Sequence, residues 1–332
     1  MSQPRKIAAV VNPHSGGGRT ARRWPALSNL LERRLGPVTT RFTDEHAAGI
    51  ALTRGLLREG FDLIIAVGGD GTINEVANGF FDQDQMIRPQ AALGILPLGT
   101  GGDFRRTLQI PSNHSEAIEI LAAGVSLPID VGRASFRAND GSRGSRYFVN
   151  LVSFGMGGHV AAKSKNFMGV FGGKAAFFWA TAMTFLSYRG RHTRLTLDDG
   201  PDPLPFFITN VAVGNGQFHG GGMWPCPAAV LNDGAFDVTV IEYAGALRLL
   251  WNISMLYSGE VYAHPKVHHY EAGRILAESS SETEIEIEID GEALGTLPLE
   301  ITLLPRQLRV VVPPSSPLLG TSAAAGTGTS VP

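Results

Sequence analysis

The chain has 332 residues, and at roughly 150 residues per domain this length predicts two domains with at least one full hydrophobic core. Its 28 basic and 30 acidic residues leave a net charge of −2, which disfavours general nucleic-acid binding. The single cysteine, Cys226, excludes an internal disulfide and a thiolate metal cage. A composition that is 43% apolar, with 41 glycines and 20 prolines, favours a loop-rich α/β protein over a helical bundle.

The sequence carries no obvious targeting or membrane-spanning segment. It does not open with a signal-peptide pattern, and its longest apolar stretch, Ala175 to Tyr188, is shorter than the roughly 20 residues that span a bilayer. We therefore expect a cytoplasmic protein without a transmembrane helix.

The first part of the chain alternates short apolar runs with segments of helical periodicity. Strands are expected at Lys6–Asn12, Val38–Phe42, Asp62–Val67 and Ala92–Leu96, and helices at Arg19–Leu35, Ala47–Glu59 and Ile73–Gly79. This alternation predicts parallel βαβ units whose loops form a binding crevice at the carboxyl ends of the strands. A Rossmann-like α/β domain over residues 1–128 is the expected result.

After Asp130 the pattern changes to strands and turns. Strands are expected at Tyr147–Phe154, Leu195–Leu197, Pro205–Gly214, Phe236–Glu242, Glu284–Asp290 and Leu299–Val312, and helices mainly at Phe167–Leu186 and Ala246–Ser258. The run EIEIEI predicts an antiparallel strand that buries Ile285, Ile287 and Ile289 on one face. We expect a β-rich, sandwich-like domain over residues 129–312, whose last strand could return to the first domain, and a disordered tail over residues 313–332.

Three glycine-rich loops follow expected strands. They are Asn12–Gly18 (NPHSGGG), Gly68–Thr72 (GGDGT) and Leu98–Phe104 (LGTGGDF). Glycines let backbone N–H groups point at a phosphate, and loops after neighbouring parallel strands converge on one crevice. Each loop could also be an ordinary turn, since glycine is abundant here and Asp-Gly is a common turn dipeptide. Their convergence favours a nucleotide site.

These motifs, in this order and spacing, resemble the diacylglycerol kinase catalytic-domain family, which includes bacterial lipid kinases and sphingosine kinases. The resemblance continues through four segments: Pro128–Arg133, Asn150–Gly158, Val213–Val238 and Asp290–Gly295. GGDGT alone is shared with NAD kinases. The resemblance implies an NAD kinase-like nucleotide domain, a β-rich lipid-binding domain, and ATP and Mg²⁺ as cofactors.

The resemblance also implies roles for individual residues. The nucleotide would contact Asn12, Ser15, Gly16, Thr43, Gly68, Gly69, Gly71, Thr72, Gly99 and Thr100. Asp70 would organise the catalytic Mg²⁺ in a carboxylate–water–metal network with Asp103 and Asp130; without the family, those two acids could equally be a helix cap and a strand-end acid. A structural Mg²⁺ would bind Asp233 and the carbonyls near Val230 and Ala235, where the sequence alone predicts a turn.

Glu292 is the general base that the resemblance implies for the lipid hydroxyl. From spacing alone, Asp290-Gly291 predicts a hairpin turn and Glu292 a surface charge. One departure stands in the third loop, where Gly102 replaces the asparagine common in the family, which puts nucleotide choice or affinity in doubt.

A lipid acceptor requires apolar residues around it and basic residues near the membrane surface. Apolar candidates, each also explicable as core packing, are Phe154, Met156, Phe167, Phe171, Phe177, Phe178, Trp179, Phe218, Met223 and Trp224. Basic candidates, each also explicable as a solvated side chain, are Arg105, Arg106, Arg189, Arg191 and Arg194.

The function predicted from the sequence is that of a lipid kinase. Its partners would be a lipid substrate and, peripherally, a membrane surface, without nucleic acid; a homodimer is left open. An NAD kinase is the alternative, and a catalytically idle binding protein a further one, although the presence of Asp70, Asp103, Asp233 and Glu292 argues against an idle protein.

Overall fold

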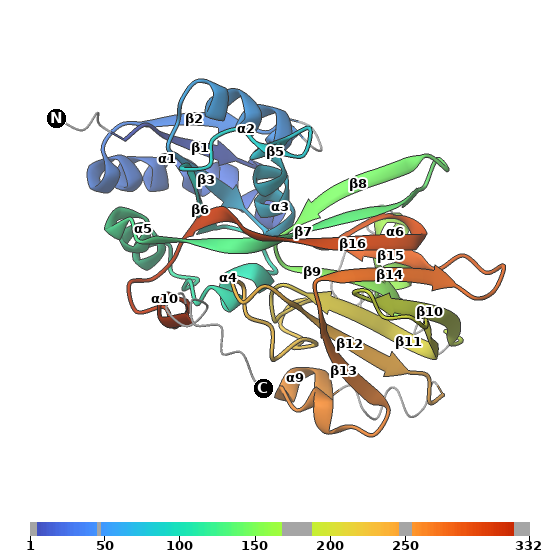
Figure 1. Cartoon of the computed structure of the whole chain (residues 1–332). Helices are drawn as coiled ribbons and strands as arrows, with labels where there is room; N and C mark the ends of the chain where they lie inside the picture. Colours follow the sequence, from blue (N-terminus) through green and yellow to red (C-terminus); the bar gives the residue numbers. More distant parts are fainter. Residues whose placement is uncertain (1–4, 45–47, 168–187, 246–253, 322–332) are drawn as a thin grey trace. The chain divides into compact units, whose positions relative to one another are not determined.

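The structure is a computed structural model that describes residues 5–44, 48–167, 188–245 and 254–321 (Figure 1). It divides into two compact units. The first comprises the chain up to Val131, Leu231–Gly234 and the chain from Leu304 onwards; the second comprises Gly132–Val230 and Ala235–Leu303. Two long strands therefore each begin in one unit and end in the other: β7 (Ser126–Ala138) and β16 (Glu292–Val311).

The first unit is built on a parallel sheet in the order β6-β3-β1-β2. These strands are β1 (Ile7–Val11), β2 (Val38–Phe42), β3 (Leu63–Gly68) and β6 (Ala92–Pro97). Every residue of β1, β3 and β6 is buried, as expected for parallel strands covered on both faces. The far end of β16 adds to this sheet, with Arg309 and Val310 paired in parallel to β6.

Helices follow the strands of this unit as the alternating pattern predicts. They are α1 (Ser15–Leu35), α2 (Ala48–Arg58), α3 (Asp70–Gly79), α4 (Asp103–Thr107), α5 (His114–Ala123) and α10 (Leu318–Thr321), with a small ribbon of β4 (Phe81–Asp82) and β5 (Gln85–Met86). The helix α3 begins three residues before its expected position, because the GGDGT loop already turns into its first helical residues. The start of α1 is irregular: Gly16, Gly17 and Gly18 have φ of +61°, +68° and +77°, so its regular turns begin near Arg19, as predicted. The α/β prediction for this part is confirmed.

The second unit is strand-rich and antiparallel. Its strands, besides its parts of β7 and β16, are β8 (Arg143–Phe148), β9 (Leu151–Gly155), β10 (Arg191–Leu197), β11 (Leu204–Gly214), β12 (Phe236–Glu242), β13 (Val267–Ala272), β14 (Arg274–Ser279) and β15 (Glu286–Ile289). One path runs β13-β12-β11-β10-β14-β16; β9 pairs with β11 and β15, and β7 pairs with β8. The short helices are α6 (Met156–Phe167), α9 (Met255–Ser258) and the 3₁₀ turn η1 (Val261–Ala263).

The core of the second unit lies on the inward faces of these strands. Ile285, Ile287 and Ile289 are at most 1% exposed, which confirms the face predicted from the EIEIEI run. The single strand expected at Tyr147–Phe154 is instead two strands. It breaks at Val149 and Asn150, whose backbone N–H groups donate to the carboxylate of Asp290 rather than to a neighbouring strand.

Two predicted segments fall wholly or partly outside the described residues. Of the helix expected at Phe167–Leu186, only Phe167 is described, as the last residue of α6; of the helix expected at Ala246–Ser258, only the end is described, as α9. Residues 313–321, expected to be disordered, are structured: Ser316 is buried, α10 follows, and Asn232 donates to the Leu318 carbonyl. Contacts distant in sequence offset the ordering entropy here, which the composition did not reveal. Over the described residues, no helix has the length and apolarity needed to cross a membrane.

Candidate active site

The three glycine loops of the first unit meet at the carboxyl ends of β1, β3 and β6. The N–H groups of Leu98 and Gly99 donate to the Gly68 carbonyl at 2.9 and 3.1 Å. A Cβ on Gly99 would lie 2.3 Å from the Gly69 Cα, and one on Gly16 would lie 2.7 Å from the Leu98 carbonyl oxygen. Side chains larger than hydrogen are therefore excluded where the loops touch, and the predicted convergence is present.

Polar side chains link the first two loops. Asn12 Nδ2 donates to Thr72 Oγ1 at 3.2 Å, and the Asn12 N–H donates to the Val67 carbonyl at 3.0 Å. The Ser15 hydroxyl donates to the Asn12 carbonyl, so it stabilises the first turn of the loop. Thr43, the residue after β2, is buried and donates its N–H to Val11. Most predicted nucleotide contacts are thus neighbours in space.

A cavity of about 280 Å³ lies on the second and third loops and beside the start of α1, and no residue of the first loop lines it. Gly68, Gly69, Gly99 and Thr100 line it, as the sequence predicts, together with basic side chains: Arg19, Arg23, Arg105, Arg106 and His114. Burial, reinforced by the charge of Arg23, lowers the pKa of His114; burial and the charge of Arg106 lower that of Arg105. This crowding of positive charge suits a polyanion such as a triphosphate.

Sequence reasoning missed Arg19, Arg23 and His114 as part of this site, and assigned Arg105 and Arg106 to a lipid head group instead. A signal for the first two exists: they stand four residues apart at the start of α1, directly after the glycine loop, so they share one helix face. His114 follows a separate loop and has no such signal.

Asp70 joins the second loop to the third. Its carboxylate accepts hydrogen bonds from the backbone N–H groups of Gly102 (2.7 Å), Asp103 (3.2 Å) and Phe104 (3.3 Å), at the start of α4. Gly102 is left-handed, with φ +75°, a conformation that glycine and asparagine adopt more readily than other residues. A glycine therefore suits the backbone at this position, and it lacks the side-chain amide of the asparagine that the resemblance leads us to expect.

The other two predicted catalytic acids have separate partners. Asp103 forms an ion pair with Arg106 at 2.5 Å. Asp130 is fully buried, and its carboxylate accepts the N–H groups of Gly234 (2.8 Å) and Arg306 (2.7 Å); burial raises its pKa while these hydrogen bonds oppose the rise. Among the residues that the structure describes, no three histidine, cysteine or acidic side chains lie close enough to hold a metal together. A water-linked network of the three acids stays a prediction.

The loop predicted to hold a structural metal is fixed by a hydrogen bond to the Asp130 carboxylate. Gly234 has φ +88°, and its N–H is held by Asp130, so the turn at Asn232–Gly234 is fixed with Asp233 exposed between them. An exposed carboxylate beside backbone carbonyls suits a hard cation. The turn is present, and the roles of Asp233, Val230 and Ala235 as ligands remain a prediction.

Glu292 lies in the second unit, directly after the turn that joins β15 to β16. Asp290 and Gly291 have φ +46° and +92°, and Ile289 pairs with Glu292 across them, which is a two-residue hairpin turn. The Asp290 carboxylate accepts the N–H groups of Val149, Asn150 and Leu151, so it fixes the turn to the chain before β9.

The side chain of Glu292 is not a surface charge. It is 13% exposed and lies 3.5 Å from the guanidinium of Arg146, itself 14% exposed. Sequence reasoning missed four residues of this region: Arg146 on β8, Asp290 in the turn, and Asn150 and Asn215, whose amides donate to the carbonyls of Phe218 and Val149. It missed them because their contacts join positions more than 60 residues apart. The hairpin turn is confirmed and the surface-charge alternative for Glu292 is wrong.

The apolar lipid candidates divide among buried positions, the partly buried Phe218, Met223 and Trp224, and undescribed positions. Phe154 is fully buried in the core and Met156 is 7% exposed, so packing explains both. Phe218 and Trp224 stack with ring centroids 5.0 Å apart. Phe171, Phe177, Phe178 and Trp179 lie outside the described residues, as does the side chain of Phe167.

The comparisons with known proteins agree with these features. Residues 6–134 match the diacylglycerol kinase catalytic domain, and residues 150–312 match the YegS C-terminal NAD kinase beta sandwich-like domain. A diacylglycerol kinase of Staphylococcus saprophyticus is 31% identical over 317 residues, which are 93% of this chain and 96% of the relative. The chain belongs to the diacylglycerol kinase family.

Further members of the family are similar over nearly the whole chain. A diacylglycerol kinase of Staphylococcus haemolyticus is 30% identical over 93% of this chain and 89% of its own. A crystal structure from Bacillus anthracis str. Sterne, described as a candidate diacylglycerol kinase, superposes with a TM-score of 0.74 at 26% identity, over 95% of this chain and 99% of that chain.

A more distant structure shares the fold alone. Yeast NADH kinase in complex with NADH superposes with a TM-score of 0.53 at 12% identity, over 100% of this chain and 90% of that chain. The predicted combination of an α/β nucleotide domain and a β-sandwich of the NAD kinase type is therefore confirmed for this member of the diacylglycerol kinase family.

Proposed function

We propose that this protein transfers the γ-phosphate of ATP to a hydroxyl of a membrane lipid, such as a diacylglycerol, a sphingoid base or a related glycerolipid. The observation that carries the proposal is the 280 Å³ cavity that the second and third glycine loops line together with four arginines and a histidine. Membership of the diacylglycerol kinase family supports a kinase, and an acceptor lipid would bring the protein to the cytoplasmic membrane surface as a peripheral partner.

The nucleotide-binding residues would position and neutralise the phosphates. Glycines permit close approach of the backbone at Gly68, Gly69 and Gly99, and the arginines and His114 line the same space. Asp70, by holding the N-terminus of α4, keeps the third loop against the second. Mg²⁺, when bound near Asp70, Asp103 and Asp130, would neutralise phosphate charge. These three residues fit the ion because carboxylates are its preferred ligands.

Transfer itself is an in-line displacement. The acceptor oxygen forms a bond to the γ-phosphorus as the bond to the β,γ-bridging oxygen breaks, and ADP leaves with that electron pair. Glu292 accepts the proton of the acceptor hydroxyl. Its shielding from water and its place beside Arg146 support this role, because general bases act from fixed positions.

The test is transfer of labelled γ-phosphate from Mg-ATP to a panel of detergent-dispersed lipids, with NAD in a parallel reaction. Label on an organic-phase product that Asp70→Ala abolishes would support the proposal. Asp140→Ala, an exposed acid at the end of the β7–β8 hairpin, is the matched control and should keep full transfer. Label on NAD alone would replace the proposal with an NAD kinase, and nucleotide binding without transfer to any acceptor would indicate an idle binding protein.

A further inference from the structure

Arg146 and Glu292 both lie on the apolar face of the second unit. Residues directly opposite each other in an antiparallel pair point to the same face. Arg146 is opposite Ala134, and Glu292 is opposite Ile289; Ala134 and Ile289 are core residues at most 1% exposed. The two charges therefore stand on the side of the strands that faces the hydrophobic core.

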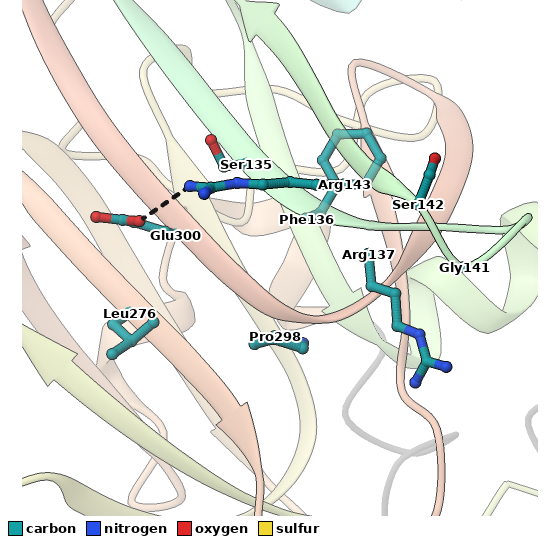
Figure 2. A pocket seen from close by; sticks show the side chains of 9 residues that line it. All are labelled: Ser135, Phe136, Arg137, Gly141, Ser142, Arg143, Leu276, Pro298 and Glu300. Carbon is teal, nitrogen blue, oxygen red and sulfur yellow. Dashed lines mark ion pairs between the residues drawn. The ribbon is translucent and has the colours of Figure 1, made fainter.

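The other arginines of the β7–β8 hairpin point to the opposite face. Arg137 and Arg143 pair with each other across the hairpin, and their side chains are 55% and 79% exposed. Figure 2 shows Arg143 extending along a hollow toward Glu300, which lies 4.0 Å from it, while the side chain of Arg137 points away from Glu300. Lined by side chains such as Phe136, Leu276 and Pro298, this hollow of about 340 Å³ contains none of the predicted site residues.

An ion pair on an apolar face is costly, because both charges lose most of their hydration. Apolar residues of similar size at the two positions would extend the core with Phe136, Phe148 and the partly buried Leu294. The pair therefore makes chemical sense only if one of the charges is needed. The proposed reaction needs the carboxylate of Glu292 as a base. The role left for Arg146 is to offset the cost of shielding that carboxylate from water.

We infer that Arg146 is a positioning residue for the reaction, which holds the Glu292 carboxylate in place and aimed at the acceptor hydroxyl. The inference rests on the proposed function. Its guanidinium approaches Glu292 Oε2 at 3.5 Å from β8, while Asp290 and the hairpin turn fix the backbone of Glu292 from the other side. The carboxylate is thus set by two elements that are distant in sequence.

The experiment compares three variants of the full-length protein in the lipid phosphorylation assay. Arg146→Gln should lower kcat about 100-fold, the scale of a misplaced catalytic group, while the KM for ATP stays unchanged because the nucleotide loops are untouched. Arg146→Lys keeps the charge but loses the planar fork, and it should recover about tenfold of that loss. Arg143→Gln removes a like charge three residues away on the opposite face and should keep the wild-type kcat.

A double-mutant cycle separates positioning from direct contact with the phosphate. If Arg146 acts through Glu292, then Arg146→Gln in a Glu292→Gln background should change kcat by less than about twofold. Two effects that multiply in full would overturn the inference, because Arg146 would then act on its own. Thermal unfolding of each variant checks the fold; should Arg146→Gln fail to fold, Arg146→Lys and its cycle with Glu292→Gln decide the matter by the same criteria.

The activities of the wild type and of Arg146→Gln distinguish a failure of this inference from a failure of the proposed function. A wild-type protein that phosphorylates no lipid would overturn both. An active wild type whose Arg146→Gln variant keeps the wild-type kcat, or loses only affinity for ATP, would overturn the role of Arg146 and leave the lipid kinase standing.

Discussion

The acidic residues of the two units have two kinds of partner, backbone N–H groups or an arginine side chain. In the first unit Asp70 and Asp130 accept backbone N–H groups from segments distant in sequence, and so does Asp290 in the second. Glu292 instead lies beside a side chain, the guanidinium of Arg146. A carboxylate that accepts two or three backbone donors is a structural clamp, since its removal leaves those N–H groups without an acceptor.

Under the proposed function, this difference separates residues that build the site from the residue proposed to accept the proton. Three of these acids look alike in sequence, because Asp70, Asp290 and Glu292 each stand beside a glycine. Asp70, Asp130 and Asp290 hold loops and turns through backbone donors, whereas Glu292, the proposed proton acceptor, lies beside a side chain. Substitutions of the two kinds should therefore fail in different ways, the clamps through folding and loop geometry, and Glu292 through chemistry alone.

The largest effect should come from Glu292→Gln. Glutamine keeps the shape of the side chain but cannot accept the hydroxyl proton, so we expect kcat for lipid phosphorylation to fall by about 10²–10⁴-fold. ATP binding, measured by calorimetry, should stay unchanged because the nucleotide loops lie on other strands. A variant that keeps more than a third of the wild-type kcat would show that Glu292 is not the base. Glu292 would then not differ in role from the acids that accept backbone N–H groups.

The next effect is expected at the contact between two glycine loops. In Gly99→Ala the new methyl group would lie 2.3 Å from the Gly69 Cα and 2.9 Å from its nitrogen, so backbone must move. We expect the affinity for ATP to fall at least about tenfold, the equivalent of 1.4 kcal/mol. Gly55→Ala in the middle of α2, where nothing lies within 4 Å, is the control and should raise stability by about 0.5–1 kcal/mol. Unchanged ATP affinity in Gly99→Ala would mean that the loops do not shape the nucleotide site.

The sequence predicts the local parts of this molecule well. Glycines, apolar runs and the EIEIEI alternation predict the parallel strands, their loops and the buried isoleucine face, because each depends on residues within about ten positions of one another. Without the family resemblance, the sequence alone could not have distinguished Glu292 from a surface charge.

The contacts that define the site span much longer separations. Asp130 and Arg306 are 176 residues apart, and Asp290 and Leu151 are 139 apart. Arg146 on its strand reads as one more arginine among four in a hairpin, and only the register with Ala134 shows that it faces inward. Strand β14 and the division of Tyr147–Phe154 into two strands were likewise not apparent, since pairing partners rather than local pattern determine them.

A smaller effect, on stability alone, is expected for Asp290→Asn. The asparagine amide offers one acceptor oxygen where the carboxylate offers two, and its NH₂ group would face a backbone donor. We expect the free energy of unfolding to fall by about 1–3 kcal/mol. Urea unfolding measures the change, with Asp202→Asn, an exposed acid in the β10–β11 loop, as the control. An unchanged midpoint would show that Asp290 is not a clamp and that Glu292 is fixed by other means.

The smallest effect concerns how stability depends on pH at a clamp and at a solvent-exposed acid. Burial raises the pKa of Asp130 above its unfolded value, so the folded protein binds a proton more readily there, and the contribution of Asp130 to stability should decline as pH rises from about 4 through that raised pKa. Asp140 is the opposite case: hydrogen bonds from Ser142 lower its pKa, so its contribution is present above the unfolded pKa and is lost as pH falls through the lowered one.

The measurement is the unfolding midpoint in urea from pH 3 to 7 for the wild type, Asp130→Asn and Asp140→Asn. The gap between wild type and Asp130→Asn should move against the wild type as pH rises, and the gap for Asp140→Asn should move in its favour by a smaller amount, since water screens an exposed carboxylate. If both gaps move in the same direction, the hydrogen bonds from Gly234 and Arg306 outweigh burial at Asp130. The pKa of Asp130 would then be lowered by folding, as it is for the exposed Asp140.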